Sequence, residues 1–67
     1  MAKYIIYLDS PLRERRYLTN VINKRPYSSA SMSMAQVCEN KELAEFIAEQ
    51  AYRYSGNKWK VQEVEVL

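Results

Sequence analysis

The fold is decided by residues 40–56, which read NKELAEFIAEQAYRYSG. This stretch predicts an amphipathic helix, because its apolar side chains recur at spacings of three and four residues. Asn40 is a favourable N-cap, Glu42 suits the first turn, and Gly56 stands where a helix commonly ends on glycine. The stripe expected to face the core comprises Leu43, Phe46, Ile47, Ala51 and Tyr54, widened by Ala44, Ala48 and Tyr52.

Strand-like stretches flank this helix on both sides. Residues 3–8, KYIIYL, are rich in Tyr and Ile and are followed by turn-favouring residues. Apolar side chains occupy both faces of this stretch, which indicates an interior position in a sheet. Residues 58–67 have a charged β pattern in which Val61 and Val64 fall on opposite faces. That pattern requires either a bulge near Gln62 or a cover that differs along the strand.

Residues 12–23 are open to two interpretations. A serine–proline pair just before them is typical of a helix start, whereas the β-branched and aromatic residues that follow favour a strand. We favour a second strand that pairs with the first as a hairpin and is closed by residues 23–26. Beyond it, residues 27–33 are expected to form a loop or an irregular edge, and residues 35–38 a short strand.

The expected fold class is α+β. One helix packs on a small three- or four-stranded antiparallel sheet in the order β-β-(β)-α-β, because this arrangement buries the apolar stripe of the helix economically. Sixty-seven residues suffice for one domain, here residues 1–67, with a net stability of roughly a few kcal/mol.

Composition excludes several classes of function. The chain has one cysteine, Cys38, and no histidine, which rules out an internal disulfide, His-based acid–base catalysis and most zinc sites. Because Gly56 is the only glycine, there is no glycine-rich phosphate loop. We therefore expect a protein that is not an enzyme and that carries neither a cofactor nor a metal. The apolar stretch Tyr4–Leu8 is too short for a signal peptide or a membrane span, so we expect a cytoplasmic protein.

The candidate partner-binding residues lie between positions 13 and 27. Cationic and aromatic side chains gather there, and both Arg and Tyr are enriched at protein interfaces. The net charge of the chain is only +2, but most of the acidic residues lie in its second half. Among the other tyrosines, Tyr4 and Tyr54 are expected in the core. The expected contacts are Arg13, Arg15, Arg16, Tyr17, Lys24, Arg25 and Tyr27.

A resemblance rests on three stretches: residues 3–8, residues 35–44 (AQVCENKELA) and residues 59–66 (WKVQEVEV). Together they resemble the short early-region proteins of phages and prophages of Gram-positive bacteria. The resemblance spans most of the chain outside residues 13–33 and carries no catalytic motif. Proteins of that group often bind and inhibit host proteins, including defence nucleases. The resemblance therefore implies a phage-encoded inhibitor or modulator that acts in the host cytoplasm.

Three kinds of partner are consistent with the candidate segment. The first, which we favour, is a host or phage protein bound by a non-catalytic protein-binding module. The second is nucleic acid, because phosphates and bases suit cations interleaved with aromatic rings, although a pI near 8.8 is low for a dedicated nucleic-acid domain. The third is a second copy of the chain, which would turn a monomer into a homodimer through the edge of the last strand. No membrane partner is expected.

Overall fold

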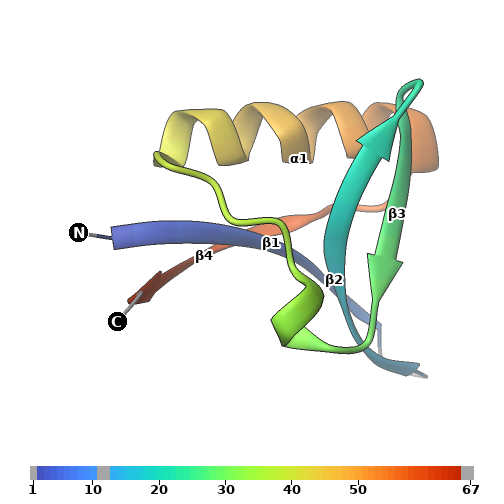
Figure 1. Cartoon of the computed structure of the whole chain (residues 1–67). Helices are drawn as coiled ribbons and strands as arrows, with labels where there is room; N and C mark the ends of the chain where they lie inside the picture. Colours follow the sequence, from blue (N-terminus) through green and yellow to red (C-terminus); the bar gives the residue numbers. More distant parts are fainter. Residues whose placement is uncertain (1, 11–12, 66–67) are drawn as a thin grey trace.

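The computed structural model describes residues 2–10 and 13–65. Within that part of the chain, four strands, a short 3-10 helix and one α-helix follow one another (Figure 1). The helix lies over one face of an antiparallel sheet, so the expected α+β class is confirmed (Figure 1). The elements are β1 (Ala2–Ser10), β2 (Arg13–Ile22), β3 (Arg25–Ser29), η1 (Met32–Met34), α1 (Lys41–Ser55) and β4 (Lys60–Glu65).

β1 is an interior strand of the sheet, whose order is β3-β2-β1-β4. It pairs with β2 through Tyr7 and Tyr17 and with β4 along most of its length. The strand interpretation of the segment after β1, and its hairpin with the first strand, are therefore confirmed. Ile5 and Ile6 are both almost fully buried although they point to opposite faces, which explains the two apolar faces of this stretch.

The last strand is covered differently on its two faces. Over the described residues, its register with β1 runs unbroken from Ala2↔Glu65 to the other end of β4, so no bulge is present there. Val61 packs against the core under the helix, whereas Val64 is half-buried on the opposite face. Of the two explanations expected from the sequence, the bulge near Gln62 is therefore wrong and the difference in cover is confirmed.

β2 leaves β1 halfway along its length, and the segment before the helix fills the gap. The Gln36 N–H donates to the Leu18 carbonyl at 2.8 Å. Cys38 exchanges two backbone hydrogen bonds with Tyr4, of 2.7 and 3.0 Å. The strand predicted at residues 35–38 is thus a single bridge, because only one residue of this segment is in register with β1.

A two-residue turn joins β2 to β3. Asn23 and Lys24 both have positive φ, 52° and 67°, as a type I′ hairpin turn requires. The closing segment predicted at residues 23–26 is therefore too long, because Arg25 and Pro26 already belong to β3. Proline is tolerated at this place since β3 is an edge strand.

The residues expected as a loop or an irregular edge divide between two elements. β3 continues to Ser29, and η1 follows after a short break. The edge is irregular, because the register of β2 with β3 shifts between Leu18 and Asn20. The Thr19 hydroxyl donates to the Tyr27 carbonyl at 3.1 Å at this irregularity.

Both predicted ends of the helix are confirmed. Asn40 Oδ1 accepts a hydrogen bond from the Leu43 N–H at 2.7 Å. Gly56 has a φ of 78°, in the left-handed region, and its N–H donates to the Tyr52 carbonyl at 2.7 Å. In the part of the chain that the structure describes, no helix is long and apolar enough to cross a membrane.

The helix packs on the sheet through alanines rather than through its largest apolar side chains. The predicted stripe is wrong at four positions, because Leu43, Phe46, Tyr52 and Tyr54 are 43%, 62%, 40% and 50% exposed. Small side chains occupy the inner positions since they let the helix approach the close-packed core around Ile6 and Leu18. The buried helix positions are Ala44, Ala48 and Ala51.

Candidate functional site

The seven predicted contact residues do not form one surface. They lie along the hairpin of β2 and β3, and the ten residues of β2 separate its base from its tip by about 30 Å. Successive residues of a strand point to opposite faces, so Arg15 and Tyr17 lie on the face away from the helix and Arg16 on the face toward it. The predicted site therefore divides into a hairpin base, at the start of β2, and a hairpin tip, at the Asn23–Lys24 turn.

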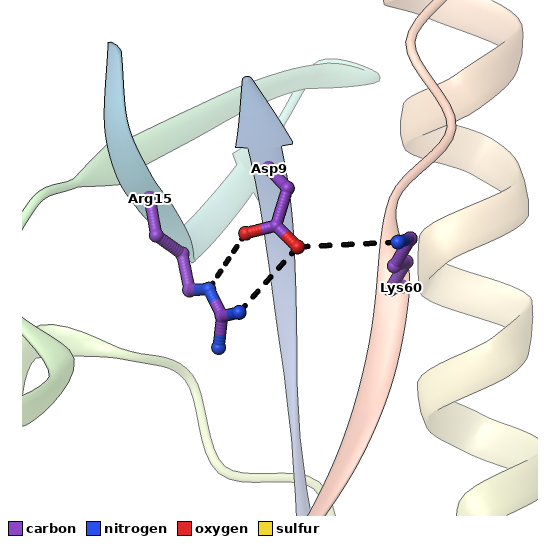
Figure 2. Close-up of polar contacts among 3 residues, drawn as sticks. All are labelled: Asp9, Arg15 and Lys60. Atoms are coloured by element: carbon purple, nitrogen blue, oxygen red, sulfur yellow. Dashed lines mark hydrogen bonds and ion pairs between the residues drawn. The ribbon is translucent and has the colours of Figure 1, made fainter. Parts of the chain in front are cut away.

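On the face away from the helix, Asp9 holds two cations at the hairpin base (Figure 2). Arg15 donates from Nε to Oδ1 at 2.7 Å and from Nη2 to Oδ2 at 3.4 Å, and Lys60 Nζ lies 3.9 Å from Oδ2. The Arg15 guanidinium carbon also lies 4.2 Å from the centre of the Tyr7 ring. The hydrogen bond to Asp9 raises the pKa of Arg15. Arg15 is thus engaged within the chain and is a poor candidate for a partner contact.

On the face toward the helix, the hairpin base borders an open hollow of about 740 Å³. Arg16 is held there by Ser28, with Nε 3.2 Å from the hydroxyl oxygen and Nη2 2.7 Å from the carbonyl oxygen. Trp59 forms another part of the wall, and its Nε1 donates to Ser55 Oγ at 3.3 Å. We name this site the hairpin-base hollow, and its main polar and aromatic residues are Arg13, Arg16, Ser28, Ser55, Asn57 and Trp59.

At the hairpin tip, Arg25 contacts the helix. Its Nε donates to Tyr54 Oη at 3.0 Å, and its guanidinium carbon lies 5.9 Å from the centre of that ring. The hydrogen bond to Tyr54 raises the pKa of Arg25. Lys24 lines a small hollow of about 210 Å³ together with Gln50, Arg53 and Tyr54. Two of the predicted contacts are therefore joined to the C-terminal half of α1.

The tyrosines divide differently from the prediction. Tyr4 packs against the core, as expected, and burial together with a hydrogen bond to Glu63 raises its pKa. Tyr54 is exposed at the hairpin tip, so its expected place in the core is wrong. Tyr27 is 44% exposed on the edge strand, beside Arg25, whereas Tyr17 is half-buried.

The sequence interpretation missed a surface along α1. Leu43, Phe46, Gln50 and Tyr54 follow one another at spacings of three and four residues, so they share one side of the helix. The contact of Arg25 with Tyr54 joins this side to the hairpin tip. The sequence did contain a signal for this surface. The three alanines of the helix also recur at spacings of three and four residues, so they predict a second side of the helix that could face the core. We name the helix–hairpin surface, which consists of Leu43, Phe46, Gln50, Tyr54, Lys24 and Arg25.

Charge is divided between the two ends of the molecule. One end holds the start of β1, the end of β4 and the N-terminal half of α1, and the other holds the hairpin, the start of β4 and the C-terminal half of α1 (Figure 1). The second end, which we name the basic half, holds eight of the ten basic residues and three of the eight acidic ones. Of these three, Asp9 pairs with Arg15 and Glu49 with Arg53. Several cations of the basic half are therefore uncompensated.

Comparison with protein-family models, with curated proteins and with solved structures found no match to this chain.

Proposed function

We propose that the chain is a small non-catalytic protein-binding module that docks through the helix–hairpin surface onto a host protein and inhibits or modulates it. The observation that carries this proposal is the inverted packing of α1. The helix buries alanines and presents larger apolar side chains, of which Phe46 is 62% exposed, to solvent. Exposed aromatic and aliphatic side chains beside an arginine are typical of the centre of a protein interface.

Because these side chains are exposed, their burial does not contribute to the free energy of unfolding of this small domain. Burial of a Leu or Phe side chain contributes about 1.5–3 kcal/mol, and whole domains are stable by only about 5–15 kcal/mol. A chain of 67 residues that keeps Leu43 and Phe46 outside its core therefore forgoes a large part of the stability open to it. A partner that covers both side chains recovers this free energy on binding.

Charge indicates the chemistry of the partner. Among the described residues, Lys24 has no carboxylate within ion-pair distance, and Arg25 bonds to the uncharged hydroxyl of Tyr54. Both cations lie at one end of the apolar side of α1. We therefore expect a partner surface that combines an apolar hollow with acidic residues beside it. Defence nucleases are the class of host protein that the phage resemblance favours.

Capture of partners from a lysate of a Gram-positive host tests the proposal. The wild-type chain is expected to retain one host protein, both with and without nuclease treatment. Phe46→Ala is expected to abolish this capture without lowering the melting temperature. Met34→Ala is the matched control, because Met34 is 61% exposed on η1 and lies outside the helix–hairpin surface. Capture that persists in Phe46→Ala, or that both variants lose equally, contradicts the surface.

Two alternative partners, nucleic acid and a second copy of the chain, are distinguished by further measurements. A nucleic-acid-binding accessory protein would lose its captured material on nuclease treatment, and its binding would weaken steeply with salt. The geometry favours it less, because Arg15 and Arg16 point to opposite faces and make no continuous track for a phosphate backbone. A homodimer would show a sedimentation coefficient that rises with protein concentration.

A further inference from the structure

The hairpin-base hollow shares no residue with the helix–hairpin surface and has a chemistry of its own. One part of its wall is cationic, with Arg13 and Arg16, and another is aromatic, with Trp59. We propose that this hollow binds a nucleoside phosphate, with the phosphate on the two arginines and the base against the indole. Its volume of about 740 Å³ falls within the range of small-molecule sites, about 300–1,000 Å³.

Arg16 is oriented for an anion before any ligand arrives. Its two hydrogen bonds to Ser28 use two of the five guanidinium N–H donors and restrain the plane of the group. The three remaining donors make no hydrogen bond with the described chain, so phosphate oxygens can accept from them. The side chain of Arg13, at the start of β2, likewise has no hydrogen bond or ion pair with a described residue, although its backbone pairs with Ser10. Both positive charges therefore remain available to a ligand.

Neighbouring carboxylates do not cancel this charge. Asp9 lines a smaller hollow beside this one together with Arg13 and Arg16, but its two carboxylate oxygens are paired with Arg15 and Lys60 (Figure 2). Because one negative charge there holds two positive groups, the hairpin base keeps a positive balance. Among the described residues that line the hollow, Glu14 is the one carboxylate. The two arginines of the lining outnumber it, so the net charge of the lining is positive.

Trp59 supplies a fixed aromatic wall. The indole packs against the core, and its Nε1 donates to Ser55 Oγ, so the ring is held in place. Nucleic-acid bases stack on such rings with little dependence on their identity. Ser55 is the last residue of α1, and the partial negative charge of a helix C-terminus disfavours a phosphate there. The two walls therefore set one direction for the ligand, with the phosphate toward β2 and the base toward the end of the helix.

The emission of Trp59 reports occupancy of the hollow directly, because it is the only tryptophan of the chain. Adenosine monophosphate is the probe, and adenosine and inorganic phosphate are its two halves. We expect adenosine monophosphate to change the emission saturably and each half to bind at least about tenfold more weakly, since each makes only part of the contacts. Equal binding by adenosine monophosphate and by phosphate alone would overturn the role of Trp59.

Arg13→Gln is the decisive variant, because the side chain of Arg13 makes no hydrogen bond or ion pair with the described chain and the substitution leaves its backbone pairing with Ser10 in place. We expect it to weaken the binding of adenosine monophosphate about tenfold, as the loss of one charge-assisted hydrogen bond does. Arg53→Gln removes the same charge from α1, outside the hollow, and should change the affinity by less than about twofold. Equal losses in the two variants, or no loss in Arg13→Gln, overturn the proposed site.

The nucleoside phosphate can be free or part of a strand, and a short oligothymidylate distinguishes the two sources. Tighter binding of the oligomer than of thymidine monophosphate, with an affinity that falls steeply with salt, identifies single-stranded nucleic acid. Equal affinities identify the free nucleotide. An emission change caused by an acidic peptide and by neither nucleotide probe overturns the proposal in favour of a protein carboxylate. Because none of these probes involves Phe46, failure here leaves the protein-binding proposal untouched.

Discussion

Cys38 shows how one residue is defined by its surroundings. Its side chain is 1% exposed, and its backbone bridges to Tyr4 in the centre of the fold. Burial raises the pKa of the Cys38 thiol, because the thiolate would lose its hydration. The residue therefore behaves as a small apolar side chain of the core and not as a reactive thiol.

The raised pKa predicts that the protein loses stability at alkaline pH. The thiol keeps its proton to a higher pH in the folded chain than in the unfolded one, so this contribution is complete below the ordinary pKa of 9.0. It is lost as the pH rises through the raised pKa of the folded state. Urea unfolding at about pH 7 and about pH 10 measures the loss, and Cys38→Ala should show a smaller one. An equal loss in both proteins would assign the effect to another group, such as the Tyr4 hydroxyl.

At the scale of the element, the turn between β2 and β3 contains a strained residue at a proposed contact. Asn23 tolerates the left-handed region, but Lys24 has a φ of 67° at a position where glycine is preferred. The side chain of Lys24 lies beside Tyr54 on the helix–hairpin surface. A lysine in this conformation is consistent with a role in binding rather than in folding.

Lys24→Gly is therefore expected to separate stability from binding. The free energy of unfolding should rise by about 0.5–1 kcal/mol, because glycine adopts the turn without strain, while capture of the partner should weaken with the lost charge. Asn23→Gly is the matched control, since it relaxes the same turn and keeps the lysine. Urea unfolding and partner capture of both variants measure the two effects. Unchanged capture in Lys24→Gly would remove this residue from the interface.

The elements were more predictable than the surfaces they present. Asn40 and Gly56 mark the helix ends because capping depends on a few neighbouring residues. The side of the helix that faces the core could not be predicted from neighbouring residues in the same way. Hydrophobicity alone favours burial of Phe46 over alanine, and only the limited space between helix and sheet favours the smaller residue. The separation of Arg15 from Arg16 follows from strand alternation, but the identity of each face depends on the register with β1.

At the scale of the whole molecule, the direction of the helix and the division of charge reinforce one another. α1 begins at the end of the molecule opposite the basic half, which we name the acidic half, and finishes in the basic half. Glu42 lies in its first turn and Arg53 in its last. Each charge complements the helix macrodipole. A molecule with a net charge of only +2 therefore presents a strongly basic end, which would orient its approach to the acidic partner that we propose.

Cation-exchange chromatography at neutral pH measures this division of charge without any partner. Replacing Lys24 and Arg25 by Gln is expected to lower the salt concentration at elution more than replacing Lys3 and Lys41 by Gln. Both double variants lose the same charge, but Lys3 and Lys41 are already paired with carboxylates in the acidic half. Equal shifts would show that the resin senses net charge alone and that no basic patch acts on it.

The alanine packing of α1 also governs how the protein tolerates mutation. A larger side chain at Ala44, Ala48 or Ala51 would overpack the contact with the sheet, at a cost of about 1–3 kcal/mol. Changes at the exposed Leu43 and Phe46 should alter stability by only about 0.5 kcal/mol. The positions that hold the scaffold are thus separate from those that we propose as partner contacts. The outer face of the helix can therefore change in sequence, and with it the proposed partner, while the same fold is kept.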